Sequence, residues 1–219
     1  SYLESPWFKN GKETELPEDF YSSEFFVDQM IEFIEEDKDK DSPFFAYLSF
    51  QAQHIPLQAP QEFIDKYLTT YEEGWDILRE QRKNKAVEKG IFPPDKKIVD
   101  SMSTLDSWSA LDQESKKMII KSMAVFAGML DAMDFHIGRF MAYLKKEGLY
   151  ENTIFIVTAD NGPEGNDPSD HAPWREWFKT TIYDRDYETL GDQDSYVYIG
   201  TEFAQAMAVS YTHLRAHET

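Results

Sequence analysis

Residues 153–161 have the sequence TIFIVTADN. Its first five residues are β-branched or aromatic, and a near-continuous apolar run of this length is typical of a strand buried on both faces of a parallel sheet. Ligands of such sheets bind just beyond the carboxyl ends of the strands. Asp160 and Asn161 stand at that position and offer the hard oxygen donors that Ca²⁺ or Mg²⁺ binds. The stretch therefore predicts a cation site at the end of a buried strand.

Asn161 and Gly162 also form an Asn-Gly pair, which is a common hairpin turn. A hairpin needs a second alternating strand directly after the turn. The sequence that follows, PEGNDPSD at residues 163–170, is polar and contains two prolines. This favours a site over a turn, but the sequence alone leaves both interpretations open.

A second apolar run, PFFAYLSF at residues 43–50, also ends in a polar loop, QAQHIPLQAP at residues 51–60. His54 in this loop can donate a proton to a leaving oxygen near neutral pH, although a lone loop histidine is more often an ordinary surface residue. Because parallel strands bring their carboxyl ends to one edge of a sheet, we expect His54 to share a pocket with Asp160 and Asn161.

Helical periodicity is clearest over residues 114–146, where apolar side chains recur three and four residues apart. Gly148 is expected to end this helix, and Ser22 or Ser23 to begin an earlier one. The strand–helix–strand order favours a right-handed parallel crossover, so the predicted fold class is α/β, a three-layer sandwich with a mainly parallel sheet flanked by helices. Further expectations are a short helix from residue 61, an irregular stretch at residues 1–20 and an insert of short helices and turns at residues 71–113.

Composition narrows the classes of partner. The 219-residue chain is 41% apolar, has a formal net charge of −19 and contains no cysteine. The acidic excess disfavours nucleic acid and anionic membranes as partners, and no apolar run has the length of a membrane span. The chain begins with Ser1 rather than Met, which we interpret as a fragment or a processed piece. The cellular compartment stays open.

Several polar groups have simpler explanations than a site. The start of a calcium-binding loop is resembled by the spacing of Asp37, Asp39 and Asp41. That loop needs glycine and glutamate where this chain has Ser42 and Leu48, so we reject a calcium-binding loop here.

His136 and the loop that contains His171 also allow more than one interpretation. His136 is expected to be a core-edge residue with satisfied hydrogen bonds. Asp167, Asp170 and His171 either line a pocket or belong to an exposed loop, and the loop is favoured.

Three stretches together resemble a type I sulfatase, and in particular the bacterial arylsulfatases of the alkaline phosphatase superfamily. They are PFFAYLSFQAQHIPLQAP at 43–60, GMLDAMDFHIGRFMAYLKKEGLYENTIFIVTADNG at 128–162 and SYVYIGTEFAQAMA at 195–208. The resemblance assigns residues 1–208 to the central part of a sulfatase catalytic domain, with an incomplete alkaline phosphatase-like fold. Residues 209–219 look like translated vector sequence and are interpreted as a non-native tail.

The resemblance implies a role for each candidate. Asp160 and Asn161 match two calcium ligands, and Asp160 would also orient a formylglycine nucleophile. His54 matches the histidine that contacts the sulfate ester and its leaving oxygen. The implied reaction is attack of hydrated formylglycine on sulfur, release of an alcohol or phenol, and collapse of the sulfated hemiacetal. The implied substrate is a small-molecule or saccharide sulfate ester.

The chain also departs from the family. It has no Cys or Ser in a C/S-x-P/A-x-R motif and lacks the paired aspartates and the lysine–histidine motif that complete the site. Formylglycine is therefore expected in a preceding part, and the 219-residue chain alone is expected not to hydrolyse sulfate esters. The alternatives are a phosphodiesterase or phosphonate monoester hydrolase of the same superfamily, and a catalytically inactive binding domain.

Overall fold

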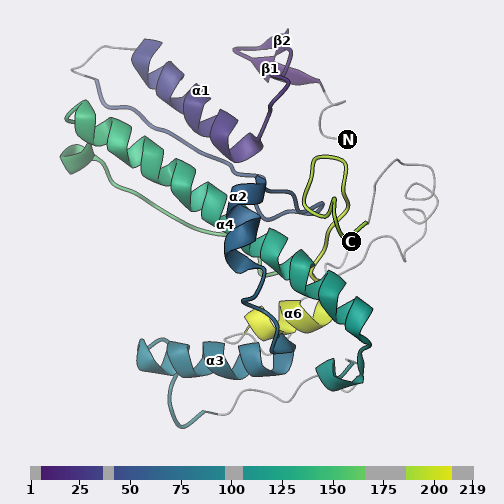
Figure 1. Ribbon diagram of the computed structural model, residues 1–219. Coiled ribbons are helices and arrows are strands. Elements are labelled where there is room, and N and C mark those ends of the chain that lie inside the picture. The colour runs from purple at the N-terminus through teal and green to yellow at the C-terminus, as the bar shows by residue number, and fades with distance from the viewer. Residues whose placement is uncertain (1–5, 37–41, 97–105, 166–185, 209–219) are drawn as a thin grey trace. The chain divides into compact units, whose positions relative to one another are not determined.

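The computed structural model describes residues 6–36, 42–96, 106–165 and 186–208 (Figure 1). The chain divides into two compact units. Unit 1 contains Ser1–Ala52 and Met133–Thr153, and unit 2 contains Gln53–Ala132 and Ile154–Thr219. The long helix α4 (Gln113–Lys146) contributes its first part to unit 2 and its last part to unit 1.

Unit 1 begins with a hairpin of β1 (Trp7–Lys9) and β2 (Lys12–Thr14), which pair antiparallel. Asn10 and Gly11 connect them with φ values of 52° and 75°. Positive φ at both central residues is the geometry of the turn that matches the strand twist, and Asn-Gly favours it. The expectation of an irregular stretch over residues 1–20 was therefore wrong for this hairpin.

The core of unit 1 lies between α1 (Ser22–Glu36) and the last part of α4. Its buried centre consists of Val27, Phe140 and Leu144. The start of α1 confirms the prediction made from its two serines. Partly buried apolar side chains surround the centre: Met30, Ile31, Ile34, Leu48, Phe50, Tyr143, Leu149 and Tyr150.

Unit 2 contains α2 (Gln61–Ile64), α3 (Gly74–Glu88), the first part of α4 and α6 (Gly200–Met207), with short 3-10 turns η2 (Asp65–Tyr67) and η3 (Trp108–Ala110). An aromatic cluster joins α3, η3 and α6. The ring of Trp75 lies 4.9 Å from Trp108 and 5.5 Å from Phe203, each edge to face. Such pairs add stability beyond the area that they bury.

The helix predictions agree with the structure in most places. Helix α4 covers the predicted 114–146, and Gly148 has a φ of 73° after the helix, as a left-handed cap requires. The short helix from residue 61 is α2 followed by η2. The predicted insert of short helices and turns at residues 71–113 contains α3, which at 15 residues is longer than the short helices expected there. Helix α6 was not predicted.

The predicted parallel sheet is not confirmed. In the described ranges the only sheet is the β1–β2 hairpin, and neither 43–50 nor 153–158 is assigned as a strand. Ile156 and Val157 are 86% and 88% exposed, and Phe45 is 93% exposed. A central strand is stable because ladders on both edges and layers on both faces cover it. The described residues do not provide those neighbours, so the prediction of two buried strands was wrong for this structure.

None of the helices in the described ranges is both long and apolar enough to cross a membrane.

Candidate functional site

His54 lies in unit 2, in the irregular segment that precedes α2. Its side chain is exposed, and Nδ1 lies 2.6 Å from the carbonyl oxygen of Ile55. A carbonyl oxygen only accepts hydrogen bonds, so Nδ1 carries the proton in this contact. In the neutral imidazole the lone pair is then on Nε2, which becomes the atom that can take up or donate a proton.

Asp160 and Asn161 also lie in unit 2, at the end of the extended segment 154–159. Both are exposed. The backbone N–H of Asn161 donates to Oδ1 of Asp160 at 2.9 Å, and Nδ2 of Asn161 donates to the carbonyl oxygen of Gly162 at 2.7 Å. These local bonds stabilise the bend at residues 160–162.

The two side chains have the donor chemistry that a hard cation needs, but they do not make a complete site. Ca²⁺ takes six to eight oxygen ligands, and two residues supply only part of such a shell. In the described part of the chain, no three His, Asp or Glu side chains gather as a metal-binding group. In the described residues, Asp160 and Asn161 therefore offer two oxygen-bearing side chains and no complete cation shell.

Other sequence candidates lie outside the described residues. They are the aspartates of the rejected calcium loop, Asp37, Asp39 and Asp41, the loop residues Asp167, Asp170 and His171, and the tail 209–219.

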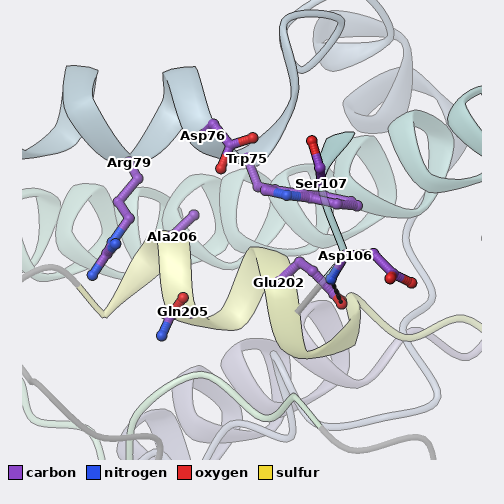
Figure 2. Close-up of a pocket in the computed structure, with 8 residues that line it drawn as sticks. All are labelled: Trp75, Asp76, Arg79, Asp106, Ser107, Glu202, Gln205 and Ala206. Atoms are coloured by element: carbon purple, nitrogen blue, oxygen red, sulfur yellow. Dashed lines mark hydrogen bonds between the residues drawn. The ribbon is translucent and has the colours of Figure 1, made fainter. Parts of the chain in front are cut away.

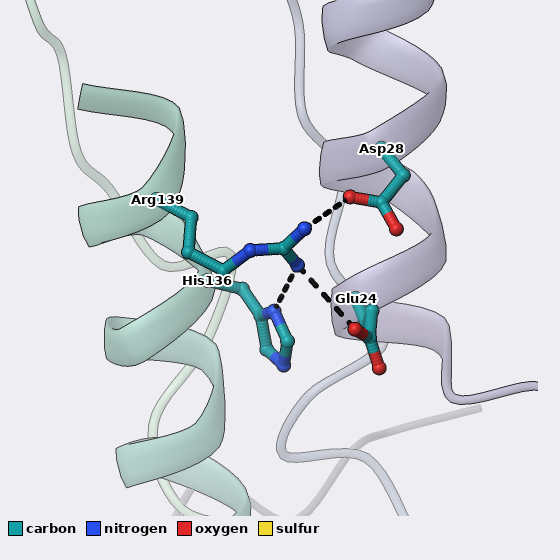
Figure 3. A network of polar contacts seen from close by, with 4 residues as sticks. All are labelled: Glu24, Asp28, His136 and Arg139. Carbon is teal, nitrogen blue, oxygen red and sulfur yellow. Dashed lines mark hydrogen bonds and ion pairs between the residues drawn. The ribbon is translucent and has the colours of Figure 1, made fainter. Parts of the chain in front are cut away.

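His136 is a structural residue, as expected. It is buried on α4, where a guanidinium N–H of Arg139 donates to its Nδ1 at 2.8 Å. The same guanidinium contacts the carboxylates of Asp28 at 2.6 Å and Glu24 at 3.5 Å on α1 (Figure 3). Since Arg139 cannot accept a hydrogen bond, Nδ1 of His136 is the acceptor. This network ties α1 to α4 within unit 1.

Sequence reasoning did not identify a pocket between α3 and α6 (Figure 2). Its volume is about 210 Å³. At one end, Glu202 Oε1 accepts the backbone N–H of Asp106 at 3.4 Å, while Arg79 lies at the other end. The complete lining is Trp75, Asp76, Arg79, Asp106, Ser107, Glu202, Gln205 and Ala206. Since these residues come from three distant segments, no local motif could have predicted the pocket, and none of the predicted site residues lines it.

Comparison with known proteins identifies the family. The sequence model named Sulfatase matches residues 2–194. The chain therefore belongs to the sulfatase family, which confirms the resemblance found in the sequence and implies an alkaline phosphatase-like α/β fold.

Three known proteins illustrate what the chain is similar to. The chain is 37% identical to an uncharacterized sulfatase of Schizosaccharomyces pombe over 85% of this chain and 34% of the relative. It is 33% identical to an arylsulfatase of Klebsiella aerogenes over 94% of this chain and 43% of the relative. It is 26% identical to a multifunctional alkaline phosphatase superfamily protein of Trinickia caryophylli over 71% of this chain and 30% of the relative. The chain thus spans less than half the length of each of these relatives.

Proposed function

We propose that this chain forms part of a sulfuric ester hydrolase of the arylsulfatase type. The observation that carries the proposal is the 33% identity to the arylsulfatase of Klebsiella aerogenes across 94% of the chain. The family match over residues 2–194 supports sulfate ester chemistry in general. The substrate class that we propose is a small-molecule or saccharide sulfate ester, with neither nucleic acid nor a membrane as a partner.

His54 is the proposed proton donor to the leaving oxygen. Cleavage of the ester bond places negative charge on that oxygen, and a positioned imidazolium offsets it. The contact of Nδ1 with the Ile55 carbonyl leaves Nε2 as the donor atom, so the active form carries protons on both ring nitrogens. An alcohol or a phenol is then released.

Asp160 and Asn161 are the proposed cation ligands of this chain. A sulfate ester is an anion and the chain has a net charge of −19, so binding requires a local source of positive charge. A divalent cation supplies this when bound, and it also acidifies a nearby hydroxyl. Carboxylate and amide oxygens fit Ca²⁺, and the proposal places the remaining ligands outside the described residues.

The nucleophile is not supplied by the residues of this chain. The 219 residues contain no cysteine and no serine in the motif from which formylglycine arises. We therefore propose that the 219-residue chain alone does not turn over sulfate esters. The complete protein, encoded by the full open reading frame, is proposed to do so. The purified chain and the complete protein are assayed with p-nitrophenyl sulfate, with and without Ca²⁺. Metal-dependent hydrolysis by the chain alone would overturn this proposal.

A second candidate is a phosphodiesterase or phosphonate monoester hydrolase. The similarity to the multifunctional alkaline phosphatase superfamily protein favours it. The ratio of kcat/KM for p-nitrophenyl sulfate to that for the diester bis-p-nitrophenyl phosphate discriminates between the two. A ratio above one supports the sulfatase, and a ratio below one supports the phosphoester enzyme.

A third candidate is a catalytically inactive binding domain. The exposure of Asp160 and Asn161 favours it, together with the incomplete metal shell in the described residues. Calcium titration and turnover of the Asp160→Ala and His54→Ala variants of the complete protein test it. If the complete parental protein turns over neither ester and both variants keep its calcium affinity, the binding domain is supported instead of the hydrolase.

A further inference from the structure

The segment that follows His54 is anchored to a distant part of unit 2. The backbone N–H of Leu57 donates to the carbonyl oxygen of Val197 at 3.0 Å, and that of Ala59 donates to Gly191 at 3.1 Å. The side chains of Leu57 and Ala59 are both buried. The backbone is therefore fixed three residues after His54, although the imidazole itself is exposed.

Gln58 adds a side-chain bond at the centre of this anchor. Its Nε2 donates to the carbonyl oxygen of Gln193 at 2.5 Å and to that of Ser195 at 3.1 Å. A glutamine amide has two N–H donors, and both have a carbonyl partner here. The side chain thus bridges two carbonyl groups that lie more than 130 positions away in the sequence.

The turn that receives Gln58 is itself well fixed. Ser195 is fully buried, and its Oγ accepts the N–H of Gly191 and donates to the carbonyl oxygen of Asp192, each at 2.8 Å. Gly191 has a φ of +103°, and a Cβ at this position would lie 2.6 Å from Cδ1 of Ile64. A side chain there would be strained by the positive φ and crowded by Ile64 and Val125, so this turn requires glycine.

We propose that Gln58 is a positioning residue for His54. By holding residues 57–59 on the turn 191–197, it fixes where the imidazole stands relative to the core of unit 2. This inference rests on the proposed role of His54 as the proton donor. Small displacements of a catalytic group are costly, since misplacement by about 1 Å can reduce a rate by about a hundredfold.

The test uses the isosteric variant Gln58→Glu. It keeps the size of the side chain and replaces two donors with a carboxylate that faces two carbonyl oxygens. The matched control is Gln61→Glu, because the amide of Gln61 donates locally to the side chain of Asp65, four residues further on at the start of η2. Both variants add the same charge in neighbouring positions.

The first measurement is hydrogen–deuterium exchange of the 219-residue chain. In Gln58→Glu the amides of Leu57 and Ala59 are expected to exchange about tenfold faster, because their bonds to the turn open more often. In Gln61→Glu their exchange is expected to stay at the parental rate. Unchanged exchange in Gln58→Glu would show that Gln58 does not hold this segment and would overturn the proposal.

The second measurement is turnover by the complete protein with two aryl sulfates that differ in their leaving group. A misplaced proton donor slows phenyl sulfate, whose phenolate leaves poorly, much more than p-nitrophenyl sulfate, whose leaving group needs little protonation. In Gln58→Glu we expect the fall in kcat to be about tenfold larger for phenyl sulfate than for p-nitrophenyl sulfate, with KM for both esters nearly unchanged. Partial unfolding would lower both rates equally.

Failure of the inference and failure of the proposed function give different results. If the complete parental protein hydrolyses neither ester, the proposed function is wrong and the positioning role falls with it. If the parental protein is active and His54→Ala loses the phenyl sulfate reaction while Gln58→Glu keeps the parental ratio, only the positioning role is overturned. Rates that fall equally for both esters also overturn it.

Discussion

A Cβ added to Gly128 of α4 would lie 2.9 Å from the backbone nitrogen of Ile64 in α2. Real Cβ atoms do not come this close to backbone atoms, so the two helices are in contact through their main chains. The contact places α2, which follows the His54 segment, directly on the most buried part of α4. A glycine in a helix interior normally costs stability, and here it permits the contact.

Replacement of Gly128 by alanine is expected to destabilise unit 2 because α2 must move away from α4. Overpacking of a close contact costs about 1–3 kcal/mol in the free energy of unfolding. The control is Gly138→Ala on the same helix, where an added Cβ meets no atom within 4 Å. It is expected to stabilise the chain by about 0.5–1 kcal/mol. Urea unfolding measures both, and a stabilising Gly128→Ala would contradict the close contact.

The exposure of the extended segment 154–159 is tested by the same substitution at two valines. Val157 is 88% exposed, whereas Val125 on α4 is fully buried. Val157→Thr is expected to change the free energy of unfolding by less than about 0.5 kcal/mol. Val125→Thr buries a hydroxyl and is expected to cost about 1–3 kcal/mol. Thermal unfolding of both variants measures this. Equal losses of unfolding free energy in Val157→Thr and Val125→Thr would show that residue 157 is buried, as the sequence had predicted.

The Arg139 network is expected to stabilise unit 1 through the shape of the guanidinium. Arg139→Lys keeps the charge, but a single ammonium cannot reach Asp28, Glu24 and His136 together. The expected loss in the free energy of unfolding is about 1 kcal/mol, since the side chains are partly exposed. Raising the salt concentration should reduce the difference in stability between the parental chain and Arg139→Lys. Arg82→Lys is the control, because Arg82 is an exposed residue of α3. An equal loss of unfolding free energy in both variants would exclude a specific role for the network.

Asp112 is expected to stabilise the start of α4 in a pH-dependent way. The backbone N–H of Ser115 donates to its Oδ1 at 2.7 Å and holds the pKa of the Asp112 carboxyl below its usual value. A lowered pKa in the folded state stabilises the fold above the unfolded-state pKa, near 4, and this stability is lost as the pH falls through the folded-state pKa. Asp112→Ala should therefore lower the Tm at pH ~7, and the difference should narrow on acidification. A difference that does not vary with pH would contradict this.

The sequence predicted helices well because their signals are local. The apolar face and Gly148 were sufficient to place α4, and the serines were sufficient to place the start of α1. The hairpin at Asn10 and Gly11 was missed although its turn signal was present, because its strands have only three residues each.

Long-range features were beyond prediction. An apolar run such as 153–158 indicates a strand, but whether the strand forms depends on neighbours that a local pattern does not contain. Likewise, Gln58 and Ser195 have no motif, and their contact depends on a turn more than 130 positions away. The roles of His54, Asp160 and Asn161 came from strand-end position and family resemblance, and they stay predictions.

The most direct test of the account is whether His54 and Asp160 act on the same bound ester. The measurement is kcat/KM of the complete protein for p-nitrophenyl sulfate in the parental form, in His54→Ala, in Asp160→Ala and in the double variant. Each single change is expected to lower kcat/KM about a hundredfold or more, and the double change to lower it by less than the product, because the two residues act as a unit. A parental kcat/KM in either single variant would contradict a shared role of His54 and Asp160. A double-variant loss equal to the product of the two single losses would also contradict it.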